Sequence, residues 1–208
     1  LDLSTNSLSA SRLRELRALC KLTAAFQKPV CERVFVGFDK CVYGAASDAE
    51  AIFLAHGSGP IVKISLKEWK ELGRFEGHSD DTNCCVVHDG LLLSGSDDYT
   101  IKVWSTTLTS AGDGACVATL AGHEARVWSV VATDDHIYSC SADKTIAAWS
   151  LADARRGVAT LVARLTAHTD VVYAVRIAFG SLFSSSADKT IKRYELGTHR
   201  TILSWEAH

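Results

Sequence analysis

A unit of 45 residues repeats along this chain, and repetition at a fixed period constrains a fold more strongly than any other sequence feature. Each clear unit has a histidine near its start and an aromatic residue 26 positions later: His78 with Trp104, His123 with Trp149, and His168 with Tyr194. Both markers recur at intervals of 45 residues. Because two independent markers share one period, the chain is predicted to consist of similar structural units.

Each unit is rich in short apolar and β-branched runs separated by turn residues, which is typical of strands. In the second unit these runs are residues 82–87, 91–96, 100–105 and 115–120. Residues 61–64 precede the similar run 101–104 by 40 residues, which indicates a degenerate first unit without the histidine and the tryptophan. The sequence therefore predicts four units, three of them clear, each an antiparallel sheet of four strands.

The clear units open with similar dipeptides: Gly77-His78, Gly122-His123 and Ala167-His168. With the repeat length and the recurring aromatic residue, this pattern resembles the WD-repeat family over roughly residues 30–208. The resemblance implies an all-β fold, a β-propeller of four-stranded antiparallel blades, with about four blades in this segment. The aspartate that normally follows the family's tryptophan is missing, because the pairs here are Trp104-Ser105, Trp149-Ser150 and Tyr194-Glu195.

The N-terminal segment, residues 1–28, has a different pattern. Apolar residues recur at helical spacing over residues 11–26, with arginine and lysine between them, which predicts a short amphipathic basic helix. This helix is interpreted first as packing on the propeller or continuing a preceding domain, second as docking a partner, and third as a mitochondrial presequence. The run 34–36 is strand-like and, by family resemblance, would be the outer strand that closes the ring.

The propeller is expected to occupy residues 29–208. Its predicted parts are a degenerate blade at 29–76, blades at 77–121 and 122–166, and a final part at 167–208 that holds one blade and the start of the next. A closed propeller of this family commonly has more blades than four, so either further blades follow residue 208 or two chains pair. The first is favoured, because the chain starts at Leu1 and contains no methionine, as a segment of a longer protein would.

Serine, histidine and aspartate side chains in contact define a catalytic triad, and such sets recur in this sequence. Three copies at identical spacing favour architecture over catalysis, because a hydrolase needs one nucleophile. By resemblance to the family, the histidine would bond the aspartate and the serine, and the serine would accept a hydrogen bond from the tryptophan. The predicted networks are His78, Ser94, Asp98 and Trp104; His123, Ser139, Asp143 and Trp149; and His168, Ser184, Asp188 and Tyr194. The third is the weakest, since a tyrosine hydroxyl and an indole nitrogen have different reach.

Partner-binding residues are inferred from the family, in which the fifth residue after the motif histidine points to the channel entrance. That position holds Asn83, Trp128 and Tyr173. The position two residues earlier holds Asp81, Arg126 and Val171, and the turns add Asp97, Ala142 and Ala187. From these we select Asn83, Arg126, Trp128, Tyr173, Asp81 and Asp97, because large aromatics beside an arginine are typical of interaction hot spots. The alternative is that the aromatic residues only pack between blades.

Composition disfavours several other functions. The formal net charge of -2 gives no basic footprint for nucleic acid or an acidic membrane. The seven cysteines include no C-x-x-C pair and are interpreted as free thiols of a reducing compartment. No apolar run approaches the ~20 residues needed to span a bilayer. Residues 56–59 and the aspartate pairs 97–98 and 134–135 are interpreted as turns, so no metal and no cofactor are predicted.

We therefore expect a non-catalytic intracellular scaffold, cytoplasmic or nuclear, that binds other proteins or peptides on the propeller face within a multiprotein complex. The alternative is a substrate-recruiting or regulatory WD-repeat domain of a larger enzyme, such as a ubiquitin ligase or a kinase.

Overall fold

The computed structural model describes residues 41–57 and 60–206 of the chain. The chain divides into two compact units, Leu1–Gly37 and Phe38–His208, and every described residue belongs to the second. The expected helix within residues 11–26 and the expected strand at 34–36 lie outside the described residues.

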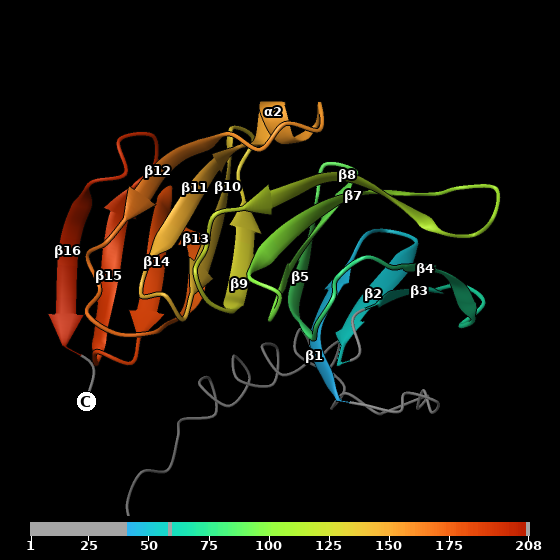
Figure 1. The fold of residues 1–208 in the computed structure, drawn as a ribbon, viewed down its shortest axis with the longest axis horizontal. Coiled ribbons are helices and arrows are strands. Elements are labelled where there is room, and N and C mark those ends of the chain that lie inside the picture. Colours follow the sequence, from blue (N-terminus) through green and yellow to red (C-terminus); the bar gives the residue numbers. More distant parts are fainter. Residues whose placement is uncertain (1–40, 58–59, 207–208) are drawn as a thin grey trace, which may run out of the picture. The chain divides into compact units, whose positions relative to one another are not determined.

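The described part forms four antiparallel sheets of four strands each, coloured from blue to red in Figure 1. Blade 1 contains β1 (Val42–Ser47), β2 (Ala51–His56), β3 (Ile61–Ser65) and β4 (Glu71–Phe75). Blade 2 contains β5 (Thr82–His88), β6 (Leu91–Ser96), β7 (Thr100–Leu108) and β8 (Gly114–Ala121). Blade 3 contains β9 (Val127–Ala132), β10 (His136–Ser141), β11 (Ile146–Ser150) and β12 (Leu161–Leu165), with the short helix α2 (Leu151–Ala154) after β11. Blade 4 contains β13 (Val172–Ala178), β14 (Ser181–Ser186), β15 (Thr190–Glu195) and β16 (Thr201–Glu206).

In each sheet the strands are hydrogen-bonded in sequence order, as hairpins require. The turn after β5 shows why these residues suit a hairpin: Asp89 and Gly90 have φ angles of 44° and 73°, a region that glycine and aspartate enter at low cost. The prediction of an all-β fold with four four-stranded antiparallel sheets is therefore confirmed.

One strand pair is longer than the sequence pattern indicated. The third strand of the second unit was expected to end at residue 105, but β7 continues to Leu108, which pairs with Gly114. The turn that follows reaches blade 1, because Asp113 forms an isolated bridge with Arg74 of β4. This hairpin therefore contacts the outer strand of the preceding blade.

The apolar core lies between successive blades. Blade 2 buries one face of its sheet, including Leu93, Ile101 and Leu120, against Val127 and Val130 of blade 3. We call this side of each blade, which packs on the next blade in sequence, its forward face. Blades 1 and 3 bury their forward faces in the same way, against Leu92 and Trp104 of blade 2 and Val172 and Tyr194 of blade 4, respectively.

The forward face of blade 4 is different. By strand register, Ile191 and Trp205 correspond to Ile101 and Leu120 of blade 2, which are fully buried. In blade 4 they are 39% and 42% exposed, and Leu203 beside them is 45% exposed. This side of blade 4 therefore has the residue pattern of an interface between blades and lies open in the described structure.

Candidate functional site

The recurring polar residues meet in three buried hydrogen-bond networks. In blade 2, His78 Nδ1 lies 2.7 Å from Asp98 Oδ2, and His78 Nε2 lies 2.7 Å from Ser94 Oγ. Trp104 Nε1 donates to the same Ser94 Oγ at 2.9 Å. These partners fit a histidine that donates from Nδ1 and accepts at Nε2, with each buried polar group satisfied by the next.

Blade 3 has the same geometry. His123 lies 2.7 Å from Asp143 and 2.8 Å from Ser139, and Trp149 Nε1 donates to Ser139 Oγ at 3.0 Å. In blade 4, His168 lies 2.7 Å from Asp188 and 2.6 Å from Ser184. The last member is weaker there, because the Ser184 and Tyr194 hydroxyls are 3.5 Å apart, at the limit of a hydrogen bond.

The aspartates of these networks are held in their charged form. Burial alone would raise the pKa of Asp98, but hydrogen bonds from His78 and Thr100 outweigh it and lower the pKa well below the ordinary value. The pKa of Asp143 is lowered in the same way by His123 and Thr145, again against the effect of burial. Each aspartate is therefore an anionic acceptor that fixes the turn around it.

The bond distances alone would suit a Ser-His-Asp catalytic triad, so access to solvent decides between the two interpretations. Ser94 and Ser139 are fully buried and Ser184 is 2% exposed. In blades 2 and 3 the serine oxygen also accepts the indole hydrogen bond. A serine enclosed in this way has no path to a substrate, so the geometry supports a structural role.

A second set of positions recurs in the first strand of every blade. The pairing of this strand with its neighbour skips one residue, which forms a β-bulge in each blade. The skipped residues are Tyr43, Asn83, Trp128 and Tyr173. A bulged residue is released from the regular alternation of the strand, so its side chain can be aimed away from both faces of the sheet.

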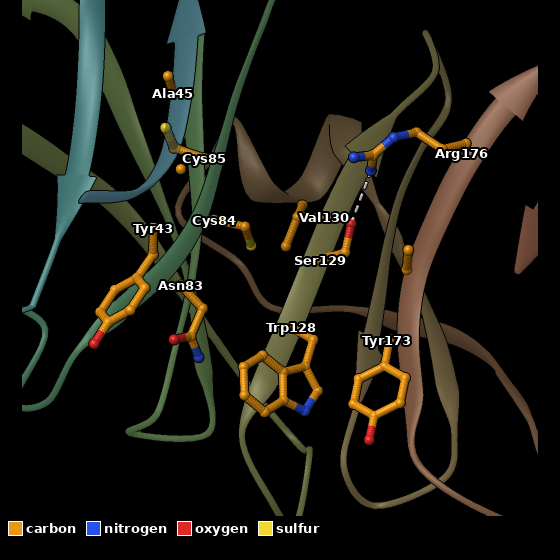
Figure 2. Close-up of a pocket in the computed structure, with 12 residues that line it drawn as sticks. Tyr43, Ala45, Asn83, Cys84, Cys85, Trp128, Ser129, Val130, Tyr173 and Arg176 are labelled. Atoms are coloured by element: carbon orange, nitrogen blue, oxygen red, sulfur yellow. Dashed lines mark hydrogen bonds between the residues drawn. The ribbon is translucent and has the colours of Figure 1, made fainter. Parts of the chain in front are cut away.

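These four side chains line one pocket (Figure 2). Its volume is about 300 Å³, and its walls come from β1, β5, β9 and β13, the first strands of the four blades. Tyr43 and Tyr173 are 52% and 54% exposed, whereas Asn83 and Trp128 are partly buried. The rings of Trp128 and Tyr173 form an edge contact with centroids 6.2 Å apart.

Three of the predicted binding residues bridge blades 2 and 3. Asn83 Nδ2 donates to Asp97 Oδ1 at 2.6 Å and to the carbonyl of Val127 at 3.1 Å. Arg126 pairs with Asp97 Oδ2 at 3.1 Å, and the arginine side chain is 57% exposed. Asp97 therefore positions the side-chain amide of Asn83 at the pocket and the guanidinium group of Arg126 outside it.

The turn between the second and third strands is tied to the start of the first strand in each of blades 2 to 4. The backbone N–H groups of Asp97, Ala142 and Ala187 donate to the carbonyls of Asp81, Arg126 and Val171 at 2.9, 3.0 and 2.8 Å, respectively. The two groups of positions selected from the sequence are therefore adjacent in space.

Tyr43 is the one of the four bulged pocket residues that the sequence analysis missed, and the lining residue Arg176 was not selected either. Blade 1 lacks the histidine from which the other positions were counted. The signal was present, however, because Tyr43 precedes Asn83 by the same 40 residues that separate run 61–64 from run 101–104. The negative charge of Asp81 beside it raises the pKa of the Tyr43 hydroxyl.

Neither of the two cysteines that line the pocket has the lowered pKa of a reactive thiol. Cys84 and Cys85 line it, but burial raises the pKa of each thiol to about 12. Within residues 41–57 and 60–206, no group of three or more His, Cys, Asp or Glu side chains is arranged to hold a metal ion. No helix of this part of the chain is long and apolar enough to cross a membrane.

Four-stranded antiparallel blades, a repeated His-Ser-Asp network and bulged side chains at one pocket define a β-propeller repeat protein. The family model described as "WD domain, G-beta repeat" matches residues 69–105, 114–150 and 159–195, more than half of the chain. The chain therefore belongs to the WD-repeat family. Each matched repeat begins near the last strand of one blade and ends with the third strand of the next.

Two curated relatives are F-box/WD repeat-containing proteins. The chain is 45% identical over 56 residues to F-box/WD repeat-containing protein 7 of Drosophila melanogaster, covering 26% of the chain and 4% of the relative. It is 34% identical over 98 residues to F-box/WD repeat-containing protein 4 of Mus musculus, covering 47% of the chain and 23% of the relative. The chain thus spans under a quarter of the length of either relative.

Among solved structures, the WD40 β-propeller domain of Doa1 matches with a TM-score of 0.68 and 25% identity. The match covers 84% of this chain and 57% of that one. This likeness agrees with the propeller fold described above.

Proposed function

We propose that the pocket formed by Tyr43, Asn83, Trp128 and Tyr173 is the entrance at which this propeller binds a segment of a partner protein, without catalysis and without a cofactor. The observation that carries the proposal is the convergence of four bulged side chains, one from each blade, on one pocket. Packing between blades does not need Tyr43 and Tyr173, because both remain more than half exposed.

The chemistry of the pocket suits a peptide segment. Aromatic rings bury large areas at low cost in conformational freedom, and the rim beside them offers the Arg126–Asp97 ion pair for polar contacts. The WD-repeat family membership and the F-box/WD relatives support a protein partner within a multiprotein complex.

The proposal is tested by comparing the proteins that co-purify with the tagged wild type and with a triple variant, Tyr43→Ala, Trp128→Ala and Tyr173→Ala. Phe179→Ala is the matched control, because Phe179 is 94% exposed at the turn that ends β13, whereas Tyr173 lies at the start of that strand. Loss of specific partners from the triple variant alone, with unchanged circular dichroism, is the expected result. Retention of every partner by the triple variant would refute the proposal.

A second candidate function is substrate recruitment for a larger enzyme, and the observation that favours it is the similarity to two F-box/WD repeat-containing proteins. In this case the partner at the pocket would be a substrate. Quantitative proteomics of cells lacking the protein would then show that the same partner accumulates and carries less ubiquitin. An unchanged partner level and modification would leave the scaffold function as the explanation.

A further inference from the structure

Three ring side chains with metal-binding atoms meet where blades 3 and 4 pack together, and none of them lines the pocket. His136 and Tyr138 belong to β10 of blade 3, and His199 lies in the turn between β15 and β16 of blade 4. The ring centres of His136 and His199 are 5.2 Å apart, and those of Tyr138 and His199 are 5.7 Å apart. Imidazole nitrogens are common ligands of transition metals, and a tyrosine oxygen can also serve as one.

The repeat does not require these residues. By strand register, the positions of His136 and Tyr138 hold other residues in the remaining blades, namely Ala51, Leu91 and Ser181 for the first and Phe53, Leu93 and Phe183 for the second. The turn that carries His199 has a counterpart in blade 1, where Trp69 takes its place: each residue donates its backbone N–H to a carbonyl four positions earlier. None of these counterparts is a histidine or a tyrosine, so the cluster is specific to this interface.

The two imidazole rings are not engaged as the other paired histidines are. The histidine–carboxylate pairs of the described residues involve His78, His88, His123 and His168. In the described part of the chain, the His136 ring has ring contacts with Tyr138 and His199 and no hydrogen bond. Burial and the neighbouring His136 lower the pKa of the His199 imidazole, which therefore keeps a lone pair at pH about 7. A neutral imidazole is the form that binds a metal ion.

The distances match the coordination of one ion. With metal–nitrogen bonds of about 2.0–2.1 Å at tetrahedral angles, neighbouring ligand atoms lie about 3.3 Å apart, and the centres of two bound imidazole rings lie about 5.3 Å apart. The structure gives 3.3 Å between Tyr138 Oη and His199 Nε2, and 5.2 Å between the two histidine ring centres. A half-turn of the His136 ring about its Cβ–Cγ bond exchanges its nitrogen and carbon positions, so either nitrogen can be presented.

We propose that His136, Tyr138 and His199 form a site for a divalent transition-metal ion that prefers imidazole ligands, such as Zn²⁺, Ni²⁺ or Cu²⁺, with water in the remaining position. Its third protein ligand is a tyrosine, so the site does not require three His, Cys, Asp or Glu side chains. Because the ligands come from two blades, the bound ion ties β10 of blade 3 to the β15–β16 turn of blade 4.

Tyr138 gives up a proton when the ion binds. Burial, and after it the negative charge of Asp135, raise the pKa of the Tyr138 hydroxyl, so without metal the phenol is protonated. A bound cation acts in the opposite direction, because it stabilises the phenolate, and the proton passes to solvent. Mg²⁺ and Ca²⁺ prefer sites built from oxygen ligands, so we expect neither to bind here.

The proposal is tested by isothermal titration calorimetry of the untagged, chelator-treated full-length protein with Zn²⁺ at pH about 7.5, with Mg²⁺ as the negative control. His136→Asn and His199→Asn each remove one ligand and are expected to weaken binding at least ~10-fold, with unchanged circular dichroism. His88→Asn is the matched control, because His88 is a partly buried histidine of β5 outside the cluster. Equal affinities of all four proteins for Zn²⁺, or an equal loss in His88→Asn, would overturn the proposal.

Two measurements on the wild type do not depend on whether a histidine variant folds. Saturating Zn²⁺ should slow hydrogen exchange of the backbone amides at 196–200 and leave those of Phe179 and Gly180 unchanged, because only the first turn carries a ligand. Cu²⁺ should produce a phenolate-to-metal charge-transfer band in the visible spectrum that disappears in Tyr138→Phe. Unchanged exchange at 196–200, or the absence of this band from the wild type, would contradict the three-ligand site.

Discussion

The difference between the networks of blades 3 and 4 leads to a quantitative prediction about stability. Trp149 and Tyr194 occupy equivalent positions, and both are 1% exposed. Trp149 donates a hydrogen bond of 3.0 Å to Ser139, whereas the Tyr194 hydroxyl lies 3.5 Å from Ser184. Replacing each by phenylalanine removes the polar contact and keeps an aromatic ring in the core.

The two substitutions should have unequal costs. Trp149→Phe loses a buried hydrogen bond, about 1 kcal/mol, together with the volume of the smaller ring of the indole, for a total of about 2–4 kcal/mol. Tyr194→Phe loses only a contact at the limit of hydrogen-bond length, so its cost is expected to stay below about 1 kcal/mol. Ser184 keeps its 2.6 Å contact with His168 in that variant.

Urea unfolding followed by far-ultraviolet circular dichroism measures both costs without relying on tryptophan emission. The free energies of unfolding are compared at equal slope, so that a change in midpoint reports stability. Equal losses for the two variants, or a larger loss for Tyr194→Phe, would refute the argument that the indole hydrogen bond distinguishes these networks.

Three further predictions follow from other parts of the structure. The pKa of Asp98 is lowered in the folded state, so the ionised carboxylate stabilises the fold above the unfolded pKa of about 3.9, and this stabilisation is lost as the pH falls below that value. In an acid titration, the free energy of unfolding of Asp98→Asn should therefore fall less steeply with decreasing pH than that of the wild type. Burial raises the pKa of the Cys85 thiol to about 12, so iodoacetamide at pH ~8 should label Cys85 in the folded protein far more slowly than the exposed Cys116, and equal labelling rates by mass spectrometry would contradict this burial. A Cβ at Gly114 would overlap the Phe75 ring, so Gly114→Ala should lower the free energy of unfolding by about 1–3 kcal/mol, and a loss under about 0.5 kcal/mol would show that the β7–β8 hairpin shifts easily.

The repeat predicted the fold because its evidence is redundant. His78, Ser94 and Trp104 have counterparts at the same spacing in two further units. The prediction of the fold therefore does not depend on any one matching residue. Strand ends were less predictable. The extension of β7 to Leu108 is stabilised by contact with blade 1, and such contacts between distant segments leave no local pattern in the sequence.

The pocket was predictable only in part. Asn83, Trp128 and Tyr173 were found because each follows a motif histidine by five residues. Tyr43 was missed because the degenerate first unit has no such histidine. Arg176 looks ordinary in sequence, and only the structure shows that it lines the pocket and donates a hydrogen bond to Ser129.

The β-bulges of the first strands also bear on how such a protein can change its specificity. Asn83 and its counterparts occupy the position of each first strand that has no partner in the second strand, so a new side chain there does not disturb the ladder of backbone hydrogen bonds between these two strands. The His-Ser-Asp networks, which connect the strands within each of blades 2 to 4, lie elsewhere. Tyr43 and Tyr173 are both more than half exposed, so mutations there should alter recognition with little effect on folding. Asn83 is different, because it also bonds Asp97 and the carbonyl of Val127 across two blades. A library randomised at positions 43 and 173 should therefore retain a high proportion of folded members.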